Sequence, residues 1–389
     1  MKQVFAVVLS VVLVINSAVS VYASDRSLRD EAMIAGAHVV EVVELIMSRY
    51  LRNDYITVET LLEAALRGMT DELDHYSVYL SAEELSQFTG ALTGRIVGIG
   101  VSMLTREDGR VEVTRVFADS PAQYAGVLPG DVIAYIDGYD VRSMTLSEIA
   151  SIITDPDTER VVIGFEREDI VVTFDILKAE IRSPTVIVER IEEIADSFGL
   201  EEFANFRYVQ ISTFGLATGD DVRMALDSMR AEGVEGIVLD LRGNTGGYLD
   251  VTVEVANLLV PAGAVLQTVN QAGRRRTYSS TLPEAPFDNM VVLVNRFTAS
   301  AAEVIASALQ DSGSAVIVGE PTFGKGLVQS VYSLRTGGAL KLTTEEYFRR
   351  NGGTINEVGV IPCIEVERRD GWDFVLRRGL EELLRGAER

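Results

Sequence analysis

The sequence predicts an α/β chain of several domains, because its pattern changes twice along its length. Apolar residues recur at helical spacing over residues 27–90, and short β runs punctuated by glycine begin near Gly94. Strand-like runs then alternate with helical patterns over residues 180–370. The chain has 389 residues, 47% of them hydrophobic, which excludes a disordered chain and allows two or three domains. We expect a helical N-terminal segment, a mixed-β domain and an α/β core.

The helical segment carries no evident chemistry. Val42 and Ile46 share the face of a first helix, Thr57 begins a second helix, and Ser81 begins a third with a capping box. Such a segment usually serves as packing or dimerisation surface. It is therefore compatible with a homodimer formed through these helices.

The mixed-β domain and the core are assigned from their runs of apolar residues. After the glycine-rich loop at Gly94, strands are predicted at 110–116, 132–136, 161–167 and 170–177, with a helix at 145–153. In the core, strands at 206–211, 236–241, 290–294 and 315–318 alternate with helices at 218–232, 248–260 and 299–311. A charged helix is predicted at 372–386.

The first 23 residues have the pattern of a secretory signal peptide. Lys2 supplies the positive charge, Val4–Ile15 is a short apolar run, and Ala23 precedes the expected cleavage point. The apolar run is shorter than the roughly 20 residues of a membrane span, although extending it to Tyr22 leaves an uncleaved anchor as the alternative. We therefore expect an exported chain, periplasmic or extracellular, which is tethered to the membrane if the signal is retained.

Charge and cysteine content exclude several classes of protein. The 35 Lys and Arg residues against 58 Asp and Glu give a net charge of −23, so we expect no nucleic-acid partner. The single cysteine, Cys363, excludes an intrachain disulfide. Together with His38 and His75 it is also too little for a Cys/His zinc cluster. Composition alone leaves a carboxylate-bound Mg²⁺ or Ca²⁺ open.

Candidate catalytic residues follow from the patterns that the chain lacks. The G-x-S-x-G elbow is absent, and a Ser-His-Asp triad would need His38 or His75, both in the helical segment. What remains is a Ser–Lys mechanism, in which a neutral amine accepts the serine proton. Only four of the 35 basic residues are lysines, and Lys325 lies between two glycines after an apolar strand. Burial there would lower its pKa.

The same segment allows a second interpretation. Gly319 to Lys325 matches a phosphate-binding loop, except that Gly326 replaces the Ser or Thr that would hold Mg²⁺. The residues after Lys325 also have the pattern of a strand, whereas such a loop leads into a helix. A nucleotide binder is therefore a disfavoured alternative.

Two further segments have a structural and a chemical interpretation that local sequence leaves open. Ser300 either forms a capping box with Glu303 or is released by a cap at Thr298, at the positive end of the helix dipole. Asp240–Gly247 follows a strand and ends in two glycines. It either forms a tight turn or presents backbone N–H groups as an anion site or oxyanion hole.

Taken together, these segments resemble the carboxyl-terminal processing proteases, the tail-specific Ser–Lys peptidases. The segments that resemble family motifs are, in chain order, Leu73–Leu80, Ser120–Gly138, Asp240–Gly247, Asn295–Glu303 and Thr322–Gln329. The chain departs from the family at His75 and Tyr76 in the first motif, at Thr245 in the third, and at Ile153–Asp155 and Cys363. Several ordered motifs in one chain make the resemblance specific.

The resemblance implies a domain order and a set of site residues. We expect a signal peptide at 1–23, a helical N-terminal region at 24–93, a PDZ domain at 94–178, a Ser–Lys protease core at 179–371 and a C-terminal helix at 372–389. The implied roles are Ser300 as nucleophile, Lys325 as general base, Gln329 as the residue that orients the lysine, and the backbone N–H groups of Gly246 and Ala301 as oxyanion hole. Gly98, Ile99, Gly100 and Val101 resemble the carboxylate loop of a PDZ domain.

The function expected from the resemblance is that of a serine endopeptidase. It would cleave proteins near their C-termini, with the PDZ domain recruiting or gating the substrate C-terminus, and without metal or organic cofactor. Its partners would be protein or peptide substrates, and an activating partner protein is left open. The alternative is a catalytically inactive PDZ scaffold that binds peptides.

Lys325 and Gln329 are separated by about 13 Å of extended chain, so their contact requires a bend or a long reach by the lysine.

Overall fold

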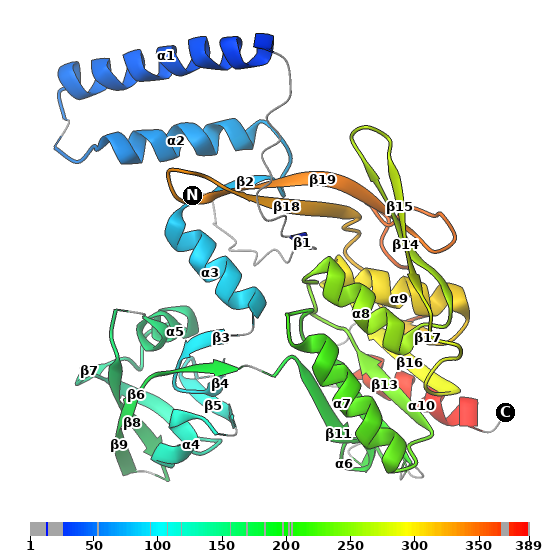
Figure 1. The fold of residues 1–389 in the computed structure, drawn as a ribbon. Helices are drawn as coiled ribbons and strands as arrows, with labels where there is room; N and C mark the ends of the chain where they lie inside the picture. Colours follow the sequence, from blue (N-terminus) through cyan, green and yellow to red (C-terminus); the bar gives the residue numbers. More distant parts are fainter. Residues whose placement is uncertain are drawn as a thin grey trace. The chain divides into compact units, whose positions relative to one another are not determined.

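The computed structural model describes residues 13–14, 26–52, 54–93, 95–106, 108–117, 119–155, 157–168, 170–182, 184–196, 198–200, 203, 205–366 and 373–387 (Figure 1). Nearly all of the predicted signal peptide, including its cleavage point, lies outside these residues. The chain forms two compact units, one of residues 1–88, 186–214 and 218–389, and one of residues 89–185 and 215–217. Within the described part, no helix is long and apolar enough to cross a membrane.

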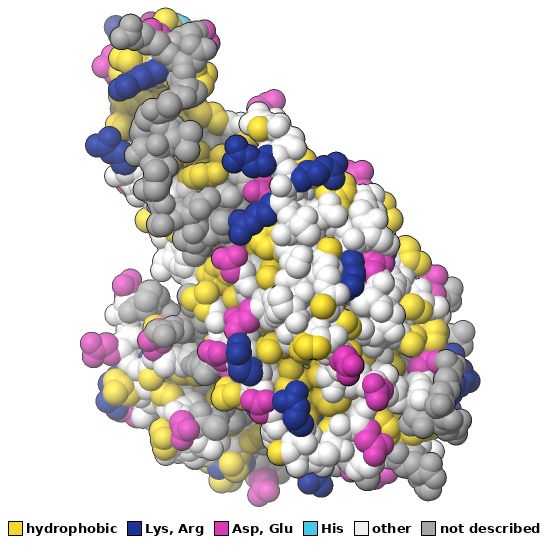
Figure 2. Space-filling model, turned by 45° about the vertical axis from the view of Figure 1, so that its right-hand side comes forward, with side chains coloured by type: hydrophobic (Ala, Val, Ile, Leu, Met, Phe, Trp, Pro, Cys, Tyr) yellow, Lys and Arg dark blue, Asp and Glu magenta, His cyan; other side chains and the backbone are white. Residues whose placement is uncertain are grey.

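The helical segment follows the prediction. It consists of α1 (Arg26–Arg49), α2 (Val58–Asp71) and α3 (Ala82–Thr93), with the short strand β2 (Val78–Leu80) before α3. The Thr57 hydroxyl accepts the Thr60 N–H at the start of α2, and Ser81 and Glu84 cap α3 reciprocally. Many apolar side chains of α1, α2 and their connection face solvent, and hydrophobic groups are visible among charged ones at the top of Figure 2.

The second unit contains the predicted mixed-β domain. Its main sheet has the order β4 (Val101–Thr105), β5 (Val111–Val116), β6 (Val132–Ile136), β8 (Arg160–Arg167) and β9 (Ile170–Leu177), with β7 (Tyr139–Asp140) paired to β6. A separate antiparallel pair joins β3 (Arg95–Gly98) to β10 (Ala179–Arg182). The helices are α4 (Pro121–Ala125) and α5 (Leu146–Thr154). Alternate side chains such as Val111 and Val113 enter the core, as the period of two requires.

The first unit contains the predicted α/β core. Its sheet has the order β11 (Val186–Arg190), β12 (Phe206–Ile211), β13 (Gly236–Asp240), β16 (Asn289–Val294), β17 (Val316–Gly319) and β20 (Ile364–Glu365), and all neighbours are parallel except β11 and β12. The helices are α6 (Ile191–Asp196), α7 (Thr218–Ala231), α8 (Leu249–Leu259), α9 (Ala301–Ser312) and α10 (Phe374–Ala387). Helix α10 packs against β13, β16 and β17. Every residue of β13 is buried, as expected of a central parallel strand.

A second sheet completes the first unit and was mostly not predicted. It has the order β1 (Leu13–Val14), β18 (Leu327–Ser333), β19 (Ala339–Arg349), β14 (Gly263–Asn270) and β15 (Arg275–Ser280), with β2 also paired to β19. Only β18 was expected from its sequence. Through β2, the helical segment is hydrogen-bonded into this sheet, which positions the loop between α2 and β2.

Candidate active site

Ser300 lies at the junction between β16 and α9, in a backbone conformation that non-glycine residues rarely adopt. Its φ is +58° and its ψ −119°, and its side chain is fully buried. The backbone N–H of Ser300 donates to Glu303 Oε2 at 2.7 Å, whereas its hydroxyl has no hydrogen-bond partner within the described structure. Thr298 does not cap α9, because its hydroxyl accepts from Asn295 N–H and donates to the Leu241 carbonyl. A buried, unpartnered hydroxyl on a strained backbone is typical of a functional site.

Glu303 joins the serine to the segment that carries the lysine. Its carboxylate is fully buried, so that burial raises its pKa, while its hydrogen bonds act in the opposite direction. Besides Ser300 N–H, it accepts hydrogen bonds from Thr322 Oγ1 at 2.5 Å, Gly324 N–H at 2.7 Å and Lys325 N–H at 2.9 Å. The sequence suggested only a helix cap at this position. In the structure, one carboxylate fixes two catalytic candidates relative to each other.

Lys325 lies in the loop between β17 and β18, with only 1% of its surface exposed. Its Nζ is 4.7 Å from the centre of the Tyr76 ring, and its carbonyl accepts a hydrogen bond from the Tyr347 hydroxyl. Burial lowers the pKa of Lys325 from 10.5 to about 7, because the charged form loses its hydration. The residues after Lys325 form a strand, as predicted, which removes the alternative of a phosphate-binding loop.

Some charged groups near Lys325 lower its pKa and others raise it. Lys341, itself buried on β19, lowers the pKa of Lys325 further, whereas Glu303 and Asp74 raise it. The Nζ of Lys341 is 5.5 Å from the centre of the Phe88 ring. Two of the four lysines of the chain therefore lie in one buried region.

Gln329 follows Lys325 on β18 and is fully buried. Its Nε2 donates to Thr343 Oγ1 at 3.3 Å, and its Oε1 has no partner among the described residues. Lys325 precedes the strand, and the β18–β19 ladder shifts register between Val328 and Gln329. The chain between the two candidates is therefore not a regular extended strand.

Gly246 approaches Ser300 so closely that a side chain would not fit. Its φ is +111°, and a Cβ built on it would lie 2.9 Å from Ser300 Cβ and 3.1 Å from Ala301 N. Its N–H donates to Asn244 Oδ1 at 2.8 Å. The two proposed oxyanion donors therefore lie beside the serine, and the Gly246 N–H already has a partner.

The strand-to-helix turn that carries Gly246 is held by charged groups. Arg242 pairs with Asp240 at 2.5 Å and with Asp373 at 2.7 Å, and Asp240 also accepts from the Tyr208 hydroxyl at 2.7 Å. These contacts attach the turn to the start of α10. The two histidines, His38 and His75, are exposed, unlike Ser300.

The second unit contains a small apolar pocket at the predicted carboxylate loop. It has a volume of about 70 Å³ and is lined by residues 98–101, by Met103 and Ile181, and by Ile153 and Thr154 of α5. Gly100 has a φ of +86°, and a Cβ on it would lie 2.3 Å from the Cβ of Ser120. Strand β4, the first in the order of its sheet, begins at this apolar pocket. An edge strand beside an apolar pocket is an arrangement that can bind an extended peptide.

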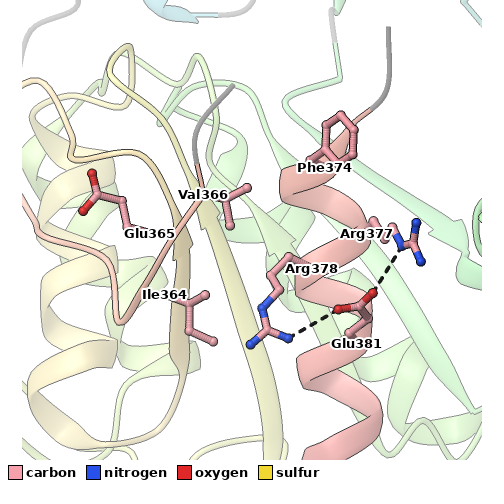
Figure 3. A pocket seen from close by; sticks show the side chains of 7 residues that line it. All are labelled: Ile364, Glu365, Val366, Phe374, Arg377, Arg378 and Glu381. Atoms are coloured by element: carbon pink, nitrogen blue, oxygen red, sulfur yellow. Dashed lines mark hydrogen bonds and ion pairs between the residues drawn. The ribbon is translucent and has the colours of Figure 1, made fainter. Parts of the chain in front are cut away.

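A larger cavity lies between β20 and α10, with a volume of about 720 Å³ (Figure 3). Figure 3 shows that its basic side chains, Arg377 and Arg378, both pair with Glu381. The lining chain continues into residues 367–372, which are outside the described part. We assign no function to this cavity. Across the described residues, no group of three or more His, Cys, Asp or Glu is placed to hold a metal ion.

The chain is similar to known peptidases. The model of peptidase family S41 matches residues 205–366, and a PDZ-domain model matches residues 112–167. The carboxy-terminal processing protease CtpB of Bacillus subtilis is 32% identical over 359 residues, which cover 91% of this chain and 72% of that protein. The carboxyl-terminal-processing protease of Synechocystis is 31% identical over 312 residues, covering 78% and 70%. Among solved structures, the photosystem II D1 C-terminal processing protease is similar with a TM-score of 0.51 and 26% identity, covering 89% of this chain and 95% of that one.

Proposed function

Because the chain belongs to the carboxy-terminal processing proteases of peptidase family S41, we propose that it cleaves proteins near their C-termini by a Ser–Lys mechanism. Ser300 is the nucleophile and Lys325 the general base. The observation that carries this assignment is the buried Glu303 carboxylate, which binds the backbone N–H groups of both residues. Burial of Lys325 supports it further, because a lysine with a pKa of about 7 is half neutral at physiological pH.

The proposed reaction begins with the Ser300 hydroxyl, which attacks the carbonyl carbon of the substrate peptide bond. Its proton moves to the neutral Lys325 amine as the C–O bond forms. The resulting ammonium then donates the proton to the leaving nitrogen, and the C–N bond breaks to give an ester on Ser300. Water, deprotonated by Lys325, hydrolyses that ester. The Ser300 hydroxyl has no hydrogen-bond partner among the described residues, so the reaction requires it to approach the Lys325 amine.

The negative charge on the substrate oxygen is stabilised by the backbone N–H groups of Ala301 and Gly246. Ala301 is the first residue of α9, where the helix dipole favours negative charge. The Gly246 N–H donates to Asn244 in the structure, so it must turn from that side chain toward the oxyanion. Gln329 orients the lysine, and its unpartnered Oε1 is the acceptor available for this role.

The remaining expectations concern substrate delivery and location. The PDZ domain captures the substrate C-terminus in the pocket at residues 98–101 and thereby recruits or gates the substrate. The sequence of residues 1–23 directs the chain out of the cytoplasm. A homodimer forms through α1, α2 and their connection, where Met33, Leu51 and Tyr55 are 68%, 91% and 90% exposed.

The decisive experiment compares purified variants in peptide hydrolysis and thermal unfolding. Ser300→Ala and Lys325→Arg should remain folded and lose turnover, since arginine keeps the charge but cannot act as a base. His38→Gln and His75→Gln serve as controls and should cleave normally, as should the wild type in EDTA. A folded Lys325→Arg chain that cleaves near the wild-type rate would remove Lys325 as base. A wild-type chain that binds C-terminal peptides yet neither cleaves nor reacts with a fluorophosphonate would instead be a binding scaffold.

A further inference from the structure

We propose that Asp74 is a positioning residue of the active site, acting through the Thr343 hydroxyl to fix the orientation of the Gln329 side-chain amide. This inference rests on the proposed function, because it presumes that Gln329 serves Lys325. It assigns a role to the loop between α2 and β2, which belongs to the helical segment without evident chemistry.

The Asp74 carboxylate is held rigidly by its own loop. Its Oδ1 accepts the backbone N–H groups of Tyr76 at 2.8 Å and Ser77 at 2.9 Å, and its Oδ2 accepts the Ser77 hydroxyl at 3.0 Å. Partial burial alone would raise the pKa of Asp74, but these hydrogen bonds and one from Thr343 lower it below its usual value. Asp74 is therefore ionised at neutral pH and can only accept hydrogen bonds.

A chain of hydrogen bonds leads from this carboxylate to Gln329. The Thr343 hydroxyl donates to Asp74 Oδ1 at 3.2 Å, and the Gln329 Nε2 donates to the same hydroxyl at 3.3 Å. The Thr343 backbone N–H donates to Ser77 Oγ at 3.0 Å, which holds β19 against the loop. The Thr343 side chain thus connects Asp74 of the loop to Gln329 of β18.

The direction of these hydrogen bonds follows from Asp74 alone. An ionised carboxylate has no proton to give, so the single Thr343 hydroxyl proton must point toward it. The hydroxyl oxygen can then only accept, which requires the NH₂ end of Gln329. The opposite end, Oε1, is left without a partner and buried, as an acceptor for the Lys325 amine. An acceptor at this point stabilises the ammonium that forms when Lys325 takes the serine proton.

The same loop also forms one wall around the lysine. The centre of the Tyr76 ring lies 4.7 Å from Lys325 Nζ, and Asp74 Oδ1 accepts the backbone N–H of Tyr76. The charged and titratable groups that surround or interact with Lys325 are Glu303 on α9, Asp74 and Tyr76 on the loop, and Lys341 and Tyr347 on β19. A test of the proposal must leave these groups unchanged.

Thr343→Val is such a test, because it removes only the hydroxyl and keeps the shape and every charge. We expect it to lower kcat at least about tenfold, the effect of one hydrogen bond, with KM and the melting temperature nearly unchanged. Thr343→Ser should restore the hydroxyl and the rate. The matched control is Thr344→Val on the same strand, whose hydroxyl bonds to Ser330 instead, and which should retain wild-type kcat.

The second measurement is the pKa of Lys325, determined by competitive labelling with acetic anhydride and mass spectrometry in the full chain. Without the Thr343 hydroxyl, the amide can turn its NH₂ end toward the lysine, which disfavours the ammonium and lowers the pKa. Mere loosening of the structure would admit water and raise the pKa toward 10.5. The two explanations therefore predict opposite signs.

The proposal is overturned if folded Thr343→Val has a kcat within about twofold of Thr344→Val, or if its Lys325 pKa is unchanged or raised. Should Thr343→Val fail to fold, Thr343→Ala takes its place, with Thr344→Ala as control and the same two readouts, because this pair also leaves every charge unchanged. Failure of the proposed function gives a different result. In that case, wild type and Lys325→Arg cleave equally or not at all, while the labelling still reports whether the hydroxyl affects Lys325.

Discussion

Replacing Lys325 with methionine should abolish hydrolysis and at the same time make the chain more stable at neutral pH. The lysine is buried where its charged form is disfavoured, and methionine is an unbranched side chain of similar length without charge. The unfolded chain, by contrast, leaves the lysine in water as an ammonium. Folding of the wild type must therefore remove a proton or bury a charge.

The magnitude follows from the two pKa values. The pKa of Lys325 falls from 10.5 to about 7, mainly through burial and then through Lys341, a difference of about 3.5 pH units. At 1.36 kcal/mol per unit, this corresponds to roughly 5 kcal/mol, an upper bound. The unfolded state binds more protons than the folded state between pH 7 and 10.5, so wild-type stability rises with pH across this window. The stability gained by Lys325→Met should be largest at pH 7 and below, and should shrink by about 1.4 kcal/mol per pH unit above it.

The assay is urea unfolding of wild type and variant at pH 7, 8 and 9, compared as differences so that other titrating groups cancel. Lys178→Met provides the contrast. That lysine is also buried, but its Nζ donates to the carbonyls of Ile152 and Asp155 and to the Thr158 hydroxyl, so its removal should destabilise the chain. A Lys325→Met chain that is less stable than wild type at pH 7, or whose stability gain does not change with pH, would contradict the folding cost assigned to the buried Lys325 ammonium.

Three further predictions test other parts of the structure. Gly246→Ala should reduce peptide hydrolysis more than about 100-fold and destabilise the fold by about 1–3 kcal/mol. The control is Gly243→Ala, at a φ of +71° with open space around it, which should lose stability through backbone strain but keep its activity. Equal activity of the two variants would contradict the close approach of Gly246 to Ser300. In the Ser300→Ala chain, a peptide with an apolar C-terminal residue should bind at least about tenfold more tightly than its C-terminal amide by calorimetry, and equal affinities would remove the assignment of the pocket at Gly100. Met33→Asp combined with Ile34→Asp on the exposed face of α1 should convert the dimer to a monomer in sedimentation, and a wild type that is already monomeric would disprove that interface.

The central strands β13, β16 and β17 could be predicted because each is mainly a continuous apolar run, whereas β11 and β20 were not predicted. β13 and β16 are almost entirely buried, and burial on both faces leaves this pattern in the sequence. The long strand β19 could not be predicted in the same way, because charged and polar residues, including four in succession, interrupt its apolar ones. Its conformation depends on pairing with β18, β14 and β2, which are distant in sequence.

The same contrast applies to the site. Ser300, Lys325 and Gln329 lie in short motifs, so sequence reasoning could name them. Glu303 was visible only as a helix cap, because its hydrogen bonds to Gly324 and Lys325 join α9 to the loop between β17 and β18, about twenty residues further along the chain. The involvement of residues 74–77 had no local signal apart from the family motif, since their contact with Thr343 spans more than two hundred residues.

The residues that enclose Lys325 come from segments far apart in the sequence, so Lys325 cannot act as a base until the chain has folded. During synthesis the N-terminal loop with Asp74 emerges long before β19. An amine that is not yet enclosed keeps the ordinary pKa of a lysine and is protonated at neutral pH, so it cannot activate the serine. Only when β19 joins both β18 and β2 does the lysine lose its water. Under the proposed Ser–Lys mechanism, folding itself therefore delays proteolysis.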